Sequence, residues 1–143
     1  MKHAPVIIER VVTAPVEQVW KSITDPNDMK QWYFDIPSFK AEAGYQFSFI
    51  GKDHDGKEWV HLCTVLEVIP NKKFSHTWRY EGYEGESIVT WELTPEGKST
   101  RVKLTHENLE SFPPLKSLAK ENFVQGWTEI VSRLLPEYLA KQE

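Results

Sequence analysis

Apolar side chains between Leu115 and Leu139 recur every three or four residues. This spacing places them on one side of a helix with about 3.6 residues per turn, so the segment predicts one long amphipathic helix. Such a helix needs a partner surface, because burying each large side chain is worth only about 1.5–3 kcal/mol. Pro136 cannot donate to the Ser132 carbonyl, and we expect a kink there. The apolar stripe comprises Ala119, Phe123, Trp127, Ile130, Val131, Leu134 and Tyr138.

The middle of the chain alternates apolar and polar residues with a period of two, which is typical of β-strands. One strand is predicted from Tyr45 to the turn Asp53-His54-Asp55-Gly56, and a long return strand covers Glu58 to Ile69. Short turns between successive runs favour antiparallel neighbours. The sequence therefore predicts a meander of about five strands that gives the helix its partner surface. The later strands are expected at Phe74 to Tyr80, Ser87 to Leu93 and Arg101 to His106.

The first part of the chain predicts one strand and two short helices. Val6 to Val12 is mostly β-branched and apolar, which favours a strand. Pro15 has the backbone angle of a first helical turn, and Asp25-Pro26 repeats the signal with Asp25 as the N-cap. Two such short helices bury little alone, so we expect them to close one end of a larger structure.

Composition narrows the class of protein. A chain of 143 residues suits a single domain over residues 1–143, and its only cysteine, Cys63, favours a reducing cytoplasm. The net charge of −4 gives no basic surface for nucleic acid. No stretch approaches the roughly 18 apolar residues of a membrane span, so we expect a soluble protein.

Short motifs in a fixed order connect these elements to a known family. They are Ala14-Pro15 with Val19-Trp20, Asp25-Pro26 with Trp32, Thr77-Trp78, Thr100-Arg101 with Leu104-Thr105-His106, and Gly126-Trp127. The chain resembles the family named for the activator of the heat-shock protein 90 ATPase, within the birch-pollen-allergen, START and polyketide-cyclase superfamily. The resemblance implies an α+β helix-grip fold. In that fold a curved antiparallel sheet of about six strands wraps a long C-terminal helix, with two short helices after the first strand.

The same resemblance implies a possible contact with the chaperone and a role in the stress response. In the activator itself, a separate N-terminal domain carries much of the chaperone contact, and we do not expect these 143 residues to include it. The chain also departs from the family pattern, because Trp59-Val60-His61 and Glu107-Asn108 replace glycines that are common in relatives. We expect these residues to reshape the cavity.

Six tryptophans and seven phenylalanines are unusual in so short a chain. On the inward faces of sheet and helix they would either line a cavity for a small apolar or aromatic ligand or fill the core, and both readings remain open. The candidate ligand-binding residues are Trp32, Phe47, Phe49, Trp59, His61, His76, Trp78, Trp91, His106, Phe123 and Trp127.

Catalytic and metal chemistry has weaker support in the sequence. His61, His76 and His106 lie on predicted strands and could bind zinc if their side chains converged. Their spacing matches no metal motif, so we expect each to form separate hydrogen bonds. Cys63 is expected to be structural, and no cofactor is expected. The leading hypothesis is non-enzymatic ligand binding. The alternatives are a chaperone-linked module, suggested also by aromatic residues expected at the surface (Tyr33, Phe34 and Tyr83), and a cyclase- or hydrolase-like enzyme with a cavity histidine.

Overall fold

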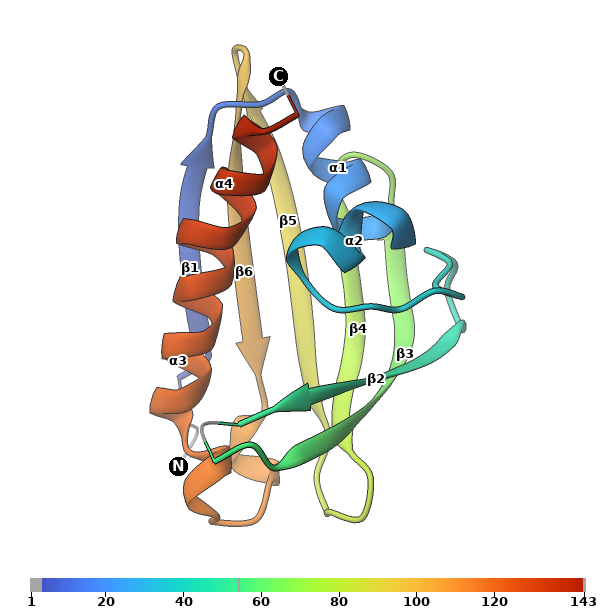
Figure 1. Ribbon diagram of the computed structural model, residues 1–143, viewed down its shortest axis with the longest axis vertical. Helices are drawn as coiled ribbons and strands as arrows, with labels where there is room; N and C mark the ends of the chain where they lie inside the picture. The colour runs from blue at the N-terminus through green and yellow to red at the C-terminus, as the bar shows by residue number, and fades with distance from the viewer. Residues whose placement is uncertain (1–3, 54, 143) are drawn as a thin grey trace.

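The computed structural model describes residues 4–53 and 55–142. A six-stranded antiparallel sheet curves around the C-terminal helix, with the strands in the order β1-β6-β5-β4-β3-β2 (Figure 1). The predicted fold class is therefore confirmed. The strands are β1 (Val6–Val12), β2 (Gln46–Lys52), β3 (Glu58–Ile69), β4 (Lys73–Tyr80), β5 (Ser87–Glu96) and β6 (Ser99–Glu107).

Two short helices, α1 (Val16–Thr24) and α2 (Pro26–Trp32), follow the first strand as expected. The Asp25 carboxylate accepts hydrogen bonds from the amides of Asn27, at 2.8 Å, and Asp28, which confirms the predicted N-cap. Pro15 is not the first helical residue. Its ψ of 155° leaves it extended, as the N-cap of α1. Both helices lie at the end of the sheet where the chain also ends (Figure 1).

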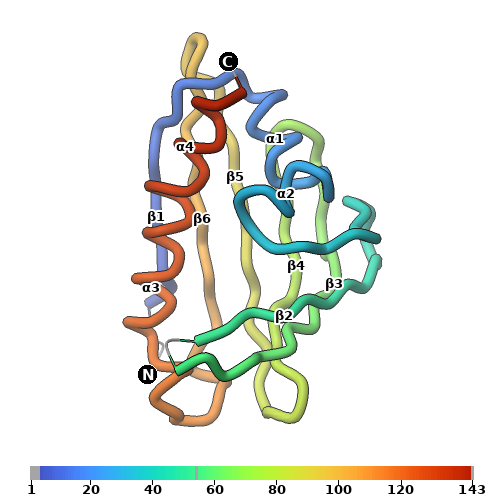
Figure 2. Tube along the Cα trace, in the orientation of Figure 1, coloured from blue at the N-terminus to red at the C-terminus, as the bar shows by residue number. Residues whose placement is uncertain are grey.

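The segment after α2 carries aromatic residues over the concave face of the sheet. Figure 2 shows it crossing in front of β4 and β3 before the chain turns back into β2. Tyr33, Phe34 and Tyr83 were expected at the surface, and this expectation was wrong. All three are partly buried and pack against the hydrophobic core. Tyr33 and Phe34 belong to the segment that lies on the sheet, whereas Tyr83, between β4 and β5, packs against Trp59 with ring centroids 4.9 Å apart.

The C-terminal helix begins later than predicted. Leu115 is 41% exposed, and a 3-10 turn, η2 (Lys116–Leu118), directs Leu118 into the core. Ala119 then adopts an extended backbone with ψ of 145°, so the α-helix starts only at Lys120. The helix consists of α3 (Lys120–Glu129), a π-helical turn η3 (Ile130–Leu134) and α4 (Leu135–Ala140), and another 3-10 turn, η1 (Leu109–Ser111), precedes η2. None of the helices in the described residues is long and apolar enough to span a membrane.

The π-helical turn keeps the buried side of the helix in phase. An α-helix advances about 100° per residue, so residues spaced four apart drift around it by about 40° at each step. A π turn has more residues per turn, so each residue rotates by less than 100° and the drift becomes smaller. The Leu135 amide donates to the Ile130 carbonyl in this turn. The expected kink at Pro136 thus takes the form of a π turn just before it. The buried residues spaced four apart are Phe123, Trp127, Val131, Leu135 and Leu139.

Arg10 compensates for the hydrogen-bond donor that Pro136 lacks. In a regular helix the amide of residue 136 would donate to the Ser132 carbonyl, but proline has no amide hydrogen. Arg10 Nη1, on strand β1, donates to that carbonyl at 3.1 Å. One residue of the first strand therefore satisfies the backbone of the last helix.

We predict that Arg10→Met lowers the free energy of unfolding by about 1 kcal/mol, since it removes a charge-assisted hydrogen bond at the surface. In a Pro136→Ala background, where residue 136 regains its amide hydrogen, the same change should have a smaller effect. Urea unfolding of the four proteins in this double-mutant cycle measures the difference. Strictly additive effects would contradict the pairing.

Candidate functional site

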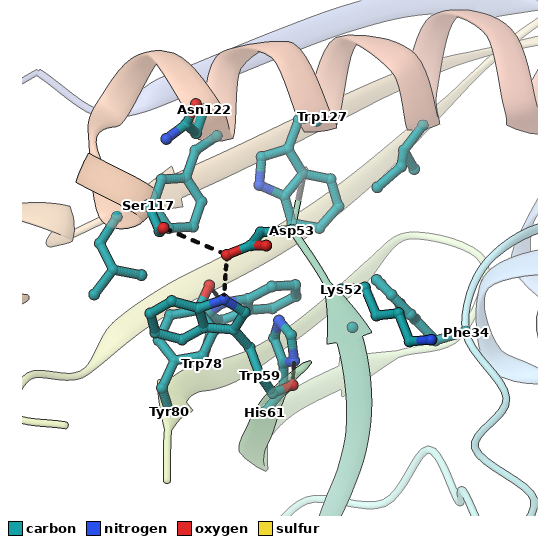
Figure 3. Close-up of a pocket in the computed structure, with 15 residues that line it drawn as sticks. Phe34, Lys52, Asp53, Trp59, His61, Trp78, Tyr80, Ser117, Asn122 and Trp127 are labelled. Atoms are coloured by element: carbon teal, nitrogen blue, oxygen red, sulfur yellow. Dashed lines mark hydrogen bonds between the residues drawn. The ribbon is translucent and has the colours of Figure 1, made fainter. Parts of the chain in front are cut away.

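A pocket of about 220 Å³ lies between α3 and the end of the sheet at which β2 meets β3. Its walls are mainly aromatic, and its polar atoms come from both the sheet and the helix (Figure 3). The lining residues are Phe34, Gly51, Lys52, Asp53, Trp59, His61, Trp78, Tyr80, Ser117, Leu118, Asn122, Phe123, Gly126, Trp127 and Ile130.

The structure divides the predicted ligand-binding residues between this pocket and a packed interior. Those brought together around the pocket are Trp59, His61, Trp78, Phe123 and Trp127. Those at the other end of the concave face surround a void of only about 10 Å³, which is room for a single water molecule. They are Trp32, Phe47, Phe49, His76 and Trp91. His106 lines neither space and is fully buried beside Trp127.

Gly51 makes room for the histidine of the pocket. It lies on β2 opposite Trp59, and a Cβ atom there would stand 2.9 Å from Cε1 of His61 and 3.4 Å from a ring carbon of Phe34. The His61 ring stacks on Phe49 with centroids 4.4 Å apart. The absence of a side chain at residue 51 therefore lets the imidazole reach the pocket wall.

Asp53 connects the two sides of the pocket mouth. Its Oδ2 accepts hydrogen bonds from Nε1 of Trp59, at 2.9 Å, and from the Ser117 hydroxyl, at 3.4 Å (Figure 3). Its Oδ1 accepts from the amides of Asp55 and Lys57, at 3.0 Å each. The bond from Trp59 is the main reason that the Asp53 pKa is lowered. The carboxylate thus ties the β2–β3 hairpin to the segment that precedes α3.

The predicted hairpin turn at this mouth is present where the structure describes it. The Asp53 amide donates to the Lys57 carbonyl, and the Gly56 amide donates to the Asp53 carbonyl, both at 3.0 Å. His54, also part of the predicted turn, lies outside the described residues. The pocket rim shares Lys52, Asp53, Ser117, Asn122 and Gly126 with a polar surface groove, so the pocket opens on this side.

His106 lies at the centre of a buried hydrogen-bond chain. Nε1 of Trp127 donates to its Nδ1 at 2.9 Å, so the ring proton must be on Nε2. That Nε2 donates to the Ser87 hydroxyl at 2.7 Å, and Ser87 donates onward to the Trp78 carbonyl at 2.7 Å. The chain holds α3 against β6, β5 and β4.

The other two strand histidines are bonded separately. Nδ1 of His61 donates to the Trp59 carbonyl at 2.9 Å, and Nδ1 of His76 donates to the Thr77 carbonyl at 2.8 Å. Burial lowers the pKa of each to about 4 and, with the other histidines nearby, that of His106 to about 3. Within residues 4–53 and 55–142, no three histidine, cysteine or acidic side chains are placed to hold a metal ion together.

Cys63 is a buried free thiol, as the sequence suggested. Burial raises its pKa well above the ordinary value, so it is poorly suited to act as a nucleophile. Gly126 lines the pocket from α3. A Cβ atom there would meet no atom of the described chain within 4 Å, which leaves the pocket open at its position.

Some pocket residues were missed as site candidates. Tyr80 continues the alternation of His76 and Trp78 on β4 and could have been found by extending it. Asp53 and Ser117 are 64 positions apart in irregular segments, and no periodicity connects them. Ile130 was assigned to helix packing but also lines the pocket.

Comparison with known families agrees with this architecture. The family described as "Activator of Hsp90 ATPase homolog 1-like protein" matches residues 13–140. The chain belongs to this family. The resemblance found from the sequence motifs is therefore confirmed, whereas no curated protein shows a significant match.

Solved structures share the fold of this family member. Protein MLL2253 from Mesorhizobium loti is 28% identical, with a TM-score of 0.78 and coverage of 97% of this chain and 98% of that one. DynU16, from the dynemicin biosynthetic locus, is 24% identical with a TM-score of 0.79, and the match covers 99% of this chain but 49% of DynU16. CV1439 from Chromobacterium violaceum is 21% identical, with a TM-score of 0.79 and coverage of 94% and 96%.

Two glycines that line the same pocket should respond oppositely to alanine. Gly51→Ala places a methyl group against buried rings, and we expect it to destabilise the protein by about 1–3 kcal/mol. Gly126→Ala adds a methyl group in open space on a helix and should stabilise by about 0.5–1 kcal/mol. Thermal or urea unfolding compares the two variants. Equal effects would show that His61 is not held against Gly51.

We also predict that the protein loses stability in mild acid. Each of the three histidines has a lowered pKa in the folded state, so the unfolded chain binds more protons below pH 6.5. Their contribution is complete above that pH and declines toward pH 4, by up to about 1.4 kcal/mol per pH unit for each histidine. Urea unfolding between pH 5 and 7.5 measures the slope.

His106→Gln provides the control for this slope. Glutamine can accept from Trp127 with its oxygen and donate to Ser87 with its nitrogen, yet it does not titrate. In this variant the number of protons taken up on unfolding in mild acid, which sets the slope, should fall by about one. An unchanged slope would mean that His106 does not contribute to the pH dependence.

Proposed function

We propose that the protein binds a small, mainly apolar molecule with one or two rings in the pocket beneath α3, without chemical turnover. The observation that carries the proposal is the contrast between the two ends of the concave face. One end is packed to a void of about 10 Å³, while the other keeps an open pocket of about 220 Å³.

The volume of the pocket limits the size of the ligand. An engineered apolar cavity of roughly 150 Å³ holds benzene, whereas sites for drug-sized molecules usually measure roughly 300–1,000 Å³. A pocket of about 220 Å³ therefore suits a molecule of one or two rings.

The walls of the pocket favour a planar aromatic ligand. Indole rings of Trp59, Trp78 and Trp127 form parts of its surface, and Trp78 and Trp127 lie 5.5 Å apart between ring centroids. Flat rings bury a large apolar area with little loss of side-chain freedom and favour offset or edge-on contacts with other rings.

The two alternatives have less support. The chaperone-linked hypothesis rests on the family description, since the aromatic residues that suggested it pack against the core. An enzyme with a cavity histidine would have to use His61, because His76 and His106 do not line the pocket. Its pKa of about 4 is far from the value near 7 that suits a general base at neutral pH.

Intrinsic fluorescence provides the test, because several tryptophans line the pocket. Titration with planar apolar compounds of one to three rings should change the emission of the wild-type protein saturably for the smaller members. Gly126→Phe, which directs a ring into the open space, should weaken binding at least about tenfold.

Val124→Phe is the matched control. Val124 lies on the same helix, is 38% exposed and does not line the pocket, so binding should be unaffected. If no compound alters the emission of the wild-type protein, or if both variants bind as it does, the proposed site is wrong.

A further inference from the structure

Three polar side chains at the pocket mouth already form hydrogen bonds within the protein. Both oxygens of Asp53 already accept two hydrogen bonds each. The Ser117 hydroxyl donates to Asp53, and the side-chain amide of Asn122 donates to the Lys116 carbonyl at 2.7 Å. Two groups deeper in the pocket keep bonding capacity that the described part of the protein does not use.

Tyr80 offers a hydrogen-bond donor there. Its hydroxyl oxygen accepts from Nε1 of Trp78 at 2.9 Å, and within the described part of the chain its own O–H donates to no group. Burial raises the Tyr80 pKa, so the hydroxyl keeps its proton. A proton that can be donated thus remains on a side chain that lines the pocket.

His61 offers a matching acceptor. Its Nδ1 must carry the ring proton because a carbonyl, that of Trp59, is the partner of this nitrogen. Nε2 is therefore a bare acceptor. In Figure 3 the His61 and Tyr80 side chains both extend from the sheet toward the space beneath α3.

The sheet places the donor and the acceptor side by side. His61 on β3 pairs directly with Tyr80 on β4, and their ring centroids are 4.8 Å apart. A neutral hydroxyl group can accept from Tyr80 and donate to His61 at the same time. A carboxylate would leave Nε2 of His61 without a donor, and an ammonium group has no lone pair for the Tyr80 proton.

We propose that the ligand is a neutral hydroxylated aromatic molecule of one or two rings, with its hydroxyl group between Oη of Tyr80 and Nε2 of His61. This inference rests on the proposed function, because it assumes that the pocket binds a ligand. The aromatic walls hold the rings, and the hydroxyl group fixes their orientation.

Equilibrium dialysis with 2-naphthol, naphthalene and 2-naphthoate at pH 7 tests this ligand class. We expect 2-naphthol to bind at least about tenfold more tightly than either of the others, because only it satisfies both groups. Tyr80→Phe should reduce the ratio of naphthol to naphthalene affinity by about tenfold.

Tyr83→Phe is the control for Tyr80→Phe. It removes a hydroxyl that contacts Lys57 at 2.8 Å outside the pocket lining, so the affinity ratio should stay as in the wild type. Thermal unfolding checks that both variants remain folded.

The outcomes separate this inference from the proposed function. If naphthalene binds as tightly as 2-naphthol, or if 2-naphthoate binds most tightly, the hydroxyl contact is wrong while the pocket remains a binding site. A ratio unchanged in Tyr80→Phe also overturns the hydroxyl contact. If none of the compounds binds, the proposed function itself fails and this inference fails with it.

Discussion

The position of the long helix on the sheet depends on a buried imidazole. His106 is fully buried, so its two ring nitrogens must find partners inside the protein. Trp127 supplies the donor for one nitrogen and Ser87 the acceptor for the other. The indole of Trp127 can only donate, so His106 must be neutral to accept its hydrogen bond. Every donor in the chain of bonds therefore points from the helix toward the sheet. The same bonds hold Trp127 as a wall of the pocket.

Trp127 also lies between the two parts of the interior, because it lines the pocket and packs against Trp91. On one side, Trp91 packs edge-on against Trp32 and Trp127 in a region with almost no free volume. On the other, the hairpin of β2 and β3 reaches toward the start of α3 (Figure 1), and Asp53 accepts a hydrogen bond from Ser117, which lies just before that helix. The pocket therefore lies beneath α3 beside this hairpin, and a side-chain contact bridges its mouth.

Much of the fold could be predicted because its signals are local. The period of two between Tyr45 and His106, the Asp25-Pro26 helix start and the four-residue repeat of the last helix each follow from neighbouring residues. The start of that helix was misplaced because Leu115 and Ala119 continue the four-residue spacing of Phe123, while in the structure Leu115 is exposed and Ala119 is extended.

The division between pocket and core could not be predicted in the same way. Alternation assigned Phe47, Phe49, Trp59 and Trp78 to one face, but it says nothing about position along the curved axis of the sheet. That position depends on strand pairing and on the irregularity between Val65 and Glu67, which has no clear sequence signal. The pocket mouth could not be predicted for another reason, because Asp53 and Ser117 come into contact only when the chain has folded.

The π-helical turn divides the last helix into two segments whose rotations are set separately. Upstream, Phe123 and Trp127 face the pocket. Downstream, the Tyr138 hydroxyl donates to the Asp28 carboxylate on α2, and this carboxylate also forms an ion pair with Lys21 on α1. These two contacts anchor the end of the last helix to α1 and α2. A π turn amounts to one residue inserted into an α-helix. Deleting a residue between Ile130 and Leu134 would therefore rotate the anchor relative to the pocket by about 100°. Point substitutions in α3 do not change the rotation between the pocket-lining residues and Tyr138. The side chains that line the pocket can therefore change while the contact of Tyr138 with Asp28 is kept.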